Sequence, residues 1–245
     1  MLRHTLLWLS SIALAALMAS AGATTWDESA NGGGDAGDLP ATAQVVLGSG
    51  PLTAITGEIS SSTDVDMYQI LISDPVNFAA WTTGALSDTQ LWLFDENGNA
   101  LWHNDDRPGD VAQPGQGSLQ SYIGSGSAAS NYRLSNATNT AAGAPGSAAW
   151  GLPGPGIYYI AVSAYNRDPR DSGGGNVVYS GSPFSAIHQS NPADPDRVVA
   201  SWTGTGGTGA YTIGLRGAEF VPEPASMMAL GAGLAGLLGL RRRKK

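Results

Sequence analysis

Carboxylate side chains stand two residues apart where one of the chain's apolar runs begins. Asp64 and Asp66 flank Val65, and in a β-strand such a pair projects to one face, roughly 6.5–7 Å apart. That separation is too wide for a shared proton. It suits two ligands of one hard cation, with further oxygens supplied by an adjacent segment of the chain.

A second acidic segment has the composition of a hairpin. Asp95, Asn97 and Gly98 lie between two apolar runs, and Asn-Gly is favoured where a tight turn needs positive φ. Ca²⁺ prefers oxygen ligands and tolerates irregular loops. We therefore predict a calcium site among six side chains: Asp64, Asp66, Asp95, Asn104, Asp105 and Asp106. The alternative is an acidic edge whose carboxylates accept hydrogen bonds from turn N–H groups and face water.

Residues for catalysis are sparse. His103 and His188 lie outside any zinc-ligand spacing, and the chain has no G-x-S-x-G motif. Asp64 and Asp66 meet the distance requirement of a glycoside hydrolase, but not its requirement for one desolvated acid. We therefore expect a protein that is not an enzyme. A secreted hydrolase with a carboxylate site remains an alternative.

Five tryptophans offer flat platforms for sugar rings. We expect most of them to be buried, because their segments are apolar. Trp150 differs, since it lies in a stretch rich in Ser, Ala and Gly, and it is our candidate for a ligand contact. A calcium-dependent carbohydrate-binding module is thus a further alternative. The five are Trp81, Trp92, Trp102, Trp150 and Trp202.

Charge and cysteine content exclude several classes of function. All 20 Asp and Glu residues lie between Asp27 and Glu223, whereas that stretch holds six of the 12 Lys and Arg and no lysine. Polyphosphate and anionic headgroups repel such a body, so nucleic-acid and peripheral membrane binding are poor hypotheses. The chain has no cysteine, which excludes disulfides and thiolate metal sites.

The pattern between residues 41 and 220 is that of an all-β protein. Short runs of β-branched and aromatic residues alternate with Gly, Pro, Asn and Asp clusters, and no helical period occurs. We predict a jelly-roll-like β-sandwich of about 8–10 strands. The runs are 44–47, 52–59, 65–72, 77–83, 90–94, 100–103, 119–123, 157–165, 198–202 and 210–220.

The run at Gln90–Phe94 is apolar on both faces. Trp92 and Phe94 share one face, and Leu91 and Leu93 share the other, as expected for a core strand whose outer face is covered. Residues 24–40 read as an acidic, Gly-rich leader. Two excursions near 124–155 and 166–197 read as surface loops, either tolerated insertions or binding surface.

The N-terminus reads as a secretory signal peptide. Arg3 and His4 precede an apolar run, and Ala21 and Ala23 form a small-x-small cleavage site. We predict a signal helix in residues 1–23, with cleavage after Ala23. An uncleaved anchor is the alternative.

The C-terminus combines an apolar stretch with a basic tail. Ala225–Leu240 as a helix would reach about 24 Å, short of a ~30 Å hydrocarbon core. The tail stays cytoplasmic under the positive-inside rule, so the body lies outside the cytoplasm. We predict a short transmembrane helix stopped by Arg241, Arg242, Arg243, Lys244 and Lys245.

Pro222, Glu223 and Pro224 stand just before this stretch, and residues 221–245 resemble the PEP-CTERM sorting signal of bacterial exoproteins. The resemblance implies export through the Sec machinery and processing by an exosortase, often in bacteria that make extracellular polysaccharide. It implies a membrane-anchored precursor and a final place at the cell surface or in the extracellular matrix. An ordinary tail anchor is the alternative.

The body resembles the bacterial pre-peptidase C-terminal domain. The similar segments include DAGDLPATAQ from Asp35, DTQLWLFD from Asp88 and GIYYIAV from Gly156. The resemblance implies a jelly-roll β-sandwich that acts as an accessory or binding module. YNRDP from Tyr165 and WTGTGGTG from Trp202 also resemble stretches of PEP-CTERM exoproteins.

Overall fold

The computed structural model describes residues 24–109, 111, 113–124, 132–134, 152–178, 180–182, 184–190 and 197–223. These residues form strands and loops, and none of them lies in a helix. The described ranges therefore contain no helix long and apolar enough to cross a membrane. The predicted signal helix (1–23) and transmembrane helix (225–240) fall outside them.

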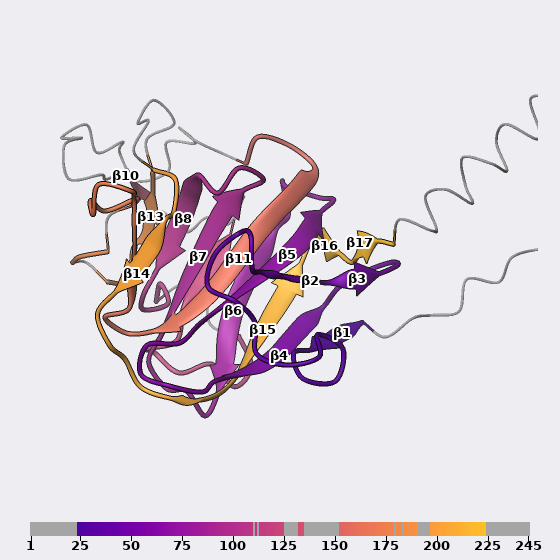
Figure 1. Cartoon of the computed structure of the whole chain (residues 1–245), viewed down its shortest axis with the longest axis horizontal. Coiled ribbons are helices and arrows are strands. Elements are labelled where there is room, and N and C mark those ends of the chain that lie inside the picture. The colour runs from indigo at the N-terminus through magenta and orange to yellow at the C-terminus, as the bar shows by residue number, and fades with distance from the viewer. Residues whose placement is uncertain are drawn as a thin grey trace, which may run out of the picture.

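Two sheets make up the body (Figure 1). The first runs, in spatial order, β1 (Thr25–Asp27), β4 (Ala54–Ile59), β15 (Gly209–Arg216), β6 (Ala79–Gly84) and β9 (Tyr122–Gly124). The second runs β10 (Tyr132–Leu134), β13 (Ile187–Gln189), β8 (Ala100–Asn104), β7 (Thr89–Asp95), β11 (Gly156–Ala164), β5 (Val65–Ile72) and β16 (Ala218–Glu219), and β2 (Gln44–Val45) also pairs with β5. Two small pairs join β12 (Asp168–Arg170) to β14 (Ser201–Thr203) and β3 (Leu47–Gly48) to β17 (Val221–Pro222).

The central strands follow a regular order. The first sheet has β4-β15-β6-β9 and the second has β5-β11-β7-β8, with antiparallel neighbours throughout. Along the chain these strands switch sheets at every step except the β7–β8 hairpin. This arrangement of the described strands is that of a jelly roll. The prediction of an all-β sandwich is confirmed.

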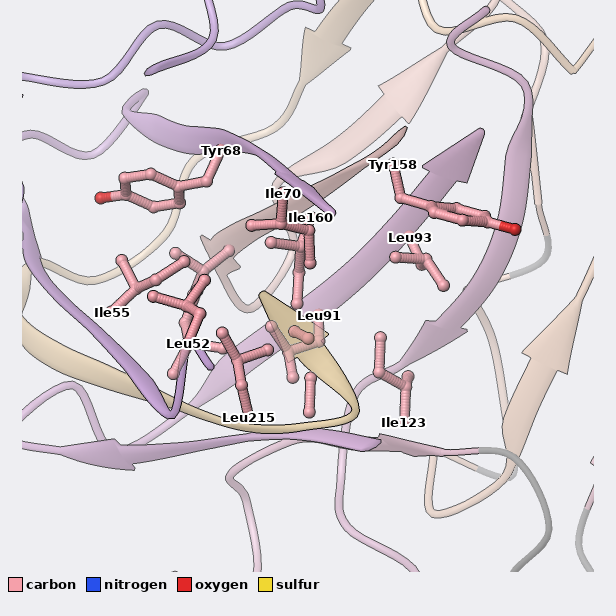
Figure 2. Packing of buried hydrophobic residues seen from close by; sticks show 14 of the residues in the cluster. Leu52, Ile55, Tyr68, Ile70, Leu91, Leu93, Ile123, Tyr158, Ile160 and Leu215 are labelled. Atoms are coloured by element: carbon pink, nitrogen blue, oxygen red, sulfur yellow. The ribbon is translucent and has the colours of Figure 1, made fainter. Parts of the chain in front are cut away.

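The main core lies between the two sheets. Side chains alternate along each strand, so Ile70, Leu91 and Ile160 point from the second sheet toward Ile55 and Leu215 of the first (Figure 2). All five are buried. This apolar layer is the main source of stability that a chain without cysteine has available.

A second apolar cluster covers the outer face of the second sheet. Trp92 and Phe94 pack there, while Leu91 and Leu93 face the main core. The ring of Trp202 meets those of Trp92 and Phe94 edge-on, at centroid distances of 5.8 and 6.4 Å. The prediction that the run 90–94 is a core strand with a covered outer face is confirmed. Val177 and Val178, from the excursion 166–197, are buried in the same cluster.

Residues 24–40, predicted as a leader, pack on the sandwich. Strand β1 pairs in parallel with β4. Trp26 is buried, and its Nε1 donates a hydrogen bond to Gln44 Oε1 at 3.0 Å. Strands β1 and β17, near the two ends of the described chain, lie on the same side of the sandwich (Figure 1).

Candidate binding site

The β7–β8 hairpin brings three carboxylates together. Asp88 directly precedes β7, and Asp105 and Asp106 directly follow β8. The strands are antiparallel, with Leu91 opposite Asn104, so the start of one lies beside the end of the other. One carboxylate oxygen from each of Asp88, Asp105 and Asp106 lies within 4.8 Å of the others. We call these three residues the hairpin group.

Asp105 is the buried member of the hairpin group. Asp105 is only 2% exposed, and its Oδ1 has no hydrogen-bond partner. Burial, followed by the charges of Asp106, Asp88 and Asp168, raises the pKa of Asp105 to about 8. Burial also raises the pKa of Asp88 and of Asp106. A bare carboxylate in this position is costly unless a proton or a cation compensates it.

Asn104 holds the loop that carries Asp105 and Asp106. Its Nδ2 donates to the carbonyl oxygens of Asp106 at 2.7 Å, Ala186 at 3.0 Å and Phe184 at 3.3 Å. Its Oδ1 accepts from the N–H of Tyr122 at 2.7 Å. This side chain therefore fixes the backbone of the loop rather than offering a ligand oxygen.

A second group of carboxylates lies where β1, β4, β5 and β15 meet. Glu28, Asp35 and Asp66 place carboxylate oxygens within 4.8 Å of one another, and we call them the N-terminal group. Glu28 Oε1 accepts from Ala36 N at 2.9 Å and Oε2 from Glu58 N at 3.0 Å. Glu28 thus ties the segment after β1 to strand β4.

Asp66 points into the sandwich rather than to solvent. It is 0% exposed; its Oδ2 accepts from Tyr211 Oη at 2.7 Å, and Tyr211 Oη lies 2.6 Å from Tyr68 Oη. Its Oδ1 has no hydrogen-bond partner. Burial raises the pKa of Asp66 to about 10; the Tyr211 hydrogen bond opposes this shift, and the charge of Glu28 adds to it. At neutral pH Asp66 is therefore protonated unless a cation is bound.

The other predicted ligands cap turns. Asp64 precedes β5, and its Oδ2 accepts from the N–H and the hydroxyl of Ser60. Asp95 Oδ1 accepts from the N–H groups of Asn97 and Asn99, both at 2.9 Å, in the β7–β8 turn. The six predicted ligands thus divide: Asp66 joins the N-terminal group, Asp105 and Asp106 join the hairpin group, and Asp64, Asp95 and Asn104 bind backbone.

Three members of the two groups, Asp88, Glu28 and Asp35, were not among the predicted ligands. Asp88 had a usable signal, because it precedes a strand whose hairpin partner ends in Asp105 and Asp106. Glu28 and Asp35 had no such signal, since both stand in a Gly- and Asp-rich segment without a periodic pattern.

An open groove lies beside the hairpin group. Its volume is about 370 Å³, and Asp88, Tyr165 and Asn166 line it together with the segments 85–87 and 205–208. Tyr165 is 36% exposed and packs edge-on against Phe184, which is 37% exposed, at a centroid distance of 6.0 Å. We call this the Tyr165 groove.

The wall of the Tyr165 groove depends on close backbone approach. Gly204 has φ 89°, and a Cβ there would collide with the carbonyl oxygen of Asn166. Arg167 Nη1 donates to the Gly204 carbonyl at 3.1 Å. The two segments YNRDP and WTGTGGTG, distant in sequence, therefore meet at this groove.

The two histidines of the body lie in paired strands. His103 of β8 stands opposite His188 of β13, and both are buried. The His103 ring stacks on Trp92 at a centroid distance of 3.7 Å and on His188 at a centroid distance of 6.0 Å. This packing gives both side chains a structural role in the second sheet.

The sorting motif begins at the edge of the sandwich. Pro222 lies in β17, opposite Gly48 of β3, and is exposed together with Glu223. Pro224, Trp150 and the basic residues 241–245 lie outside the described residues.

Residues 220–244 match the PEP-CTERM protein-sorting motif. The PEP-CTERM motif indicates an exported, exosortase-targeted protein with a membrane-anchored precursor, and implies Sec export and exosortase processing. No curated protein matches the chain. The match covers the end of the chain, and the resemblance of the body to a pre-peptidase C-terminal domain remains a prediction.

Proposed function

We propose that the processed protein acts at the cell surface or in the extracellular matrix as a non-enzymatic module that binds extracellular polysaccharide. The observation that carries this proposal is the Tyr165 groove. The exposed ring of Tyr165, which packs edge-on against Phe184, lines an open groove whose other lining groups are mainly small and polar.

Sugar recognition needs both aromatic and polar side chains. Aromatic faces stack on the apolar faces of pyranose rings, and hydroxyl and amide side chains bind the ring substituents. Tyr165 supplies the first, and Asn166, Thr205 and Thr208 supply the second. A long polymer can lie along an open groove, whereas an enclosed pocket would admit only a chain end.

The surroundings of Asp66 support a role without catalysis. A retaining or inverting glycosidase needs two carboxylates that flank a bound sugar. Asp66 faces the interior of the sandwich, is fully buried, and accepts a hydrogen bond from Tyr211. A glycan cannot reach it there, which disfavours the hydrolase alternative at this carboxylate.

Affinity electrophoresis through gels that contain the polysaccharide of the native host tests the proposal. We expect the polymer to retard the wild-type protein. Tyr165→Ala should weaken binding about tenfold, because an aromatic platform contributes on the order of 1.5 kcal/mol. Val76→Ala, at a side chain that is 70% exposed in the β5–β6 turn, is the matched control and should bind normally. Equal migration of wild type and Tyr165→Ala would refute binding through the groove.

A further inference from the structure

We propose that the hairpin group of Asp88, Asp105 and Asp106 binds a divalent cation, Ca²⁺. The sequence predicted calcium on a wider set of residues, and the fold selects a different trio that includes Asp88. This proposal concerns the metal alone and does not depend on polysaccharide binding.

The charges of the hairpin group are uncompensated within the described part of the chain. Three carboxylates lie within 4.8 Å of one another. Arg170 pairs with Asp168, at 3.8 Å, rather than with a member of the hairpin group. Arg107, the residue after Asp106, directs its Nε to the carbonyl of Gly117 at 3.2 Å. A cation bound between the three carboxylates would offset their mutual repulsion.

The unpaired Oδ1 of Asp105 also supports a bound cation. It is a buried carboxylate oxygen without a hydrogen bond, and buried polar atoms of this kind are rare in folded proteins. Asp88 and Asp106 are half-buried, so solvent reaches the group from their side. A cation could therefore enter from water, keep some of its own water ligands, and bind the buried oxygen.

The ligand types and the spacing favour calcium. Oxygens that lie 2.3–2.6 Å from one ion are separated from each other by up to about 5 Å, a range that includes the 4.8 Å limit of this group. Mg²⁺ demands a tighter and more regular octahedron. The three carboxylates come from two loop segments at the ends of a hairpin, which suits the less regular coordination of Ca²⁺.

The loop is held in place before any ion binds. Asn104 Nδ2 fixes the Asp106 carbonyl, and Asp106 N donates to the Phe184 carbonyl at 3.1 Å. On the other side of the group, Tyr165 N donates to the Asp88 carbonyl at 3.2 Å. Such preorganisation lowers the conformational entropy that an ion must offset.

The N-terminal group is less open to a metal. Both oxygens of Glu28 accept backbone N–H groups, and one oxygen of Asp66 accepts a tyrosine hydroxyl. It nevertheless contains a buried carboxylate with a raised pKa, which makes Asp66→Asn a matched control for Asp105→Asn.

Thermal unfolding of the full chain in a mild non-ionic detergent, with 10 mM CaCl₂ or with EDTA, is the test. Extracellular modules bind Ca²⁺ with Kd near 10⁻⁴ M, so we expect calcium to raise the Tm by about 5–10 °C. Asp105→Asn should abolish this rise, and Asp66→Asn should keep it. MgCl₂ at the same concentration should raise the Tm less.

Three results would overturn the proposal: no rise in wild type, a rise that persists in Asp105→Asn, or a rise that is lost in Asp66→Asn. The first is the result expected if Asp105 is simply kept neutral by a proton. Should Asp105→Asn fail to fold, the Asp88→Asn/Asp106→Asn double variant changes two half-buried side chains instead. Its Tm must be insensitive to calcium if the proposal holds.

Discussion

The backbone N–H of Tyr165 donates a hydrogen bond to the carbonyl oxygen of Asp88 at 3.2 Å. This bond joins the residue after β11, which borders the Tyr165 groove, to the residue before β7, which belongs to the hairpin group. Asp88 also lines the groove itself. Any change in the position of Asp88 is therefore transmitted directly to the groove.

We expect calcium and polysaccharide to bind cooperatively for this reason. If both proposals hold, EDTA should weaken retention of the wild-type protein on polysaccharide by about fivefold or more, the usual size of coupling between linked sites. Asp105→Asn should bind weakly with or without EDTA. Affinity electrophoresis with the two additives measures this. An EDTA effect of equal size in both proteins would show that chelation acts elsewhere.

The pH dependence of stability should follow Asp66. Its pKa is raised to about 10 in the folded protein, whereas an aspartate in an unfolded chain titrates near 4. Between these values unfolding releases a proton, so the free energy of unfolding falls as pH rises. In EDTA the wild type should melt lower at pH 8 than at pH 5, and Asp66→Asn should show a shallower decline.

Asp74→Asn is the control for this pH experiment. Hydrogen bonds from Asn77 lower the pKa of Asp74, so it is ionised in both states between pH 5 and 8 and its loss should leave the slope unchanged. Glu28, Asp35, Asp64, Tyr68 and Tyr211 surround Asp66 and remain in the variant. An unaltered slope in Asp66→Asn would contradict the raised pKa of this carboxylate.

Gly57 lets the side chains of Glu28 and Tyr211 pack closely against strand β4. A Cβ at this position would collide with the Tyr211 hydroxyl and lie 2.7 Å from Glu28 Oε2. Gly57→Ala should therefore lower the free energy of unfolding by about 1–3 kcal/mol. Gly109→Ala, where a Cβ meets nothing within 4 Å, should be close to neutral. Urea unfolding of both variants measures the difference, and equal midpoints would contradict the tight packing at Gly57.

Trp202 should be essential for covering the second sheet. It is buried against Trp92 and Phe94, and its Nε1 donates to the Asp38 carbonyl at 2.6 Å. Trp202→Ala should cost about 3–5 kcal/mol of unfolding free energy. Tyr165→Ala removes an exposed ring and should cost far less. A mild effect at Trp202 would mean that the outer cluster adds little to stability.

The strands were predictable because their signals are local. The run 65–72 matches β5 at both ends, and the apolar pattern of 90–94 correctly placed Trp92 and Leu91 on opposite faces. Strand β1 was not predicted, since its three residues gain stability from pairing with β4 rather than from their own composition.

The carboxylate groups were only partly predictable because they depend on pairing across the fold. The sequence predicted Asp66, Asp105 and Asp106 as ligands of one site, whereas the fold places Asp66 in one group and the other two in another. Asp66 faces inward because β5 alternates from Val65 to Ile72, and its partner Tyr211 lies 145 residues away. The alternative for Asp95, that its carboxylate accepts hydrogen bonds from turn N–H groups, followed from turn propensity alone. The structure contains these hydrogen bonds, from Asn97 and Asn99.

Fractionation of the native host, with wild type or Tyr165→Ala expressed in place of the original protein, tests the central claim most directly. We predict that processed wild-type protein is found with the extracellular polysaccharide, and that processed Tyr165→Ala is released into the medium. Val76→Ala should behave as wild type. Processed Tyr165→Ala that remains with the polysaccharide to the same extent as wild type would contradict the account.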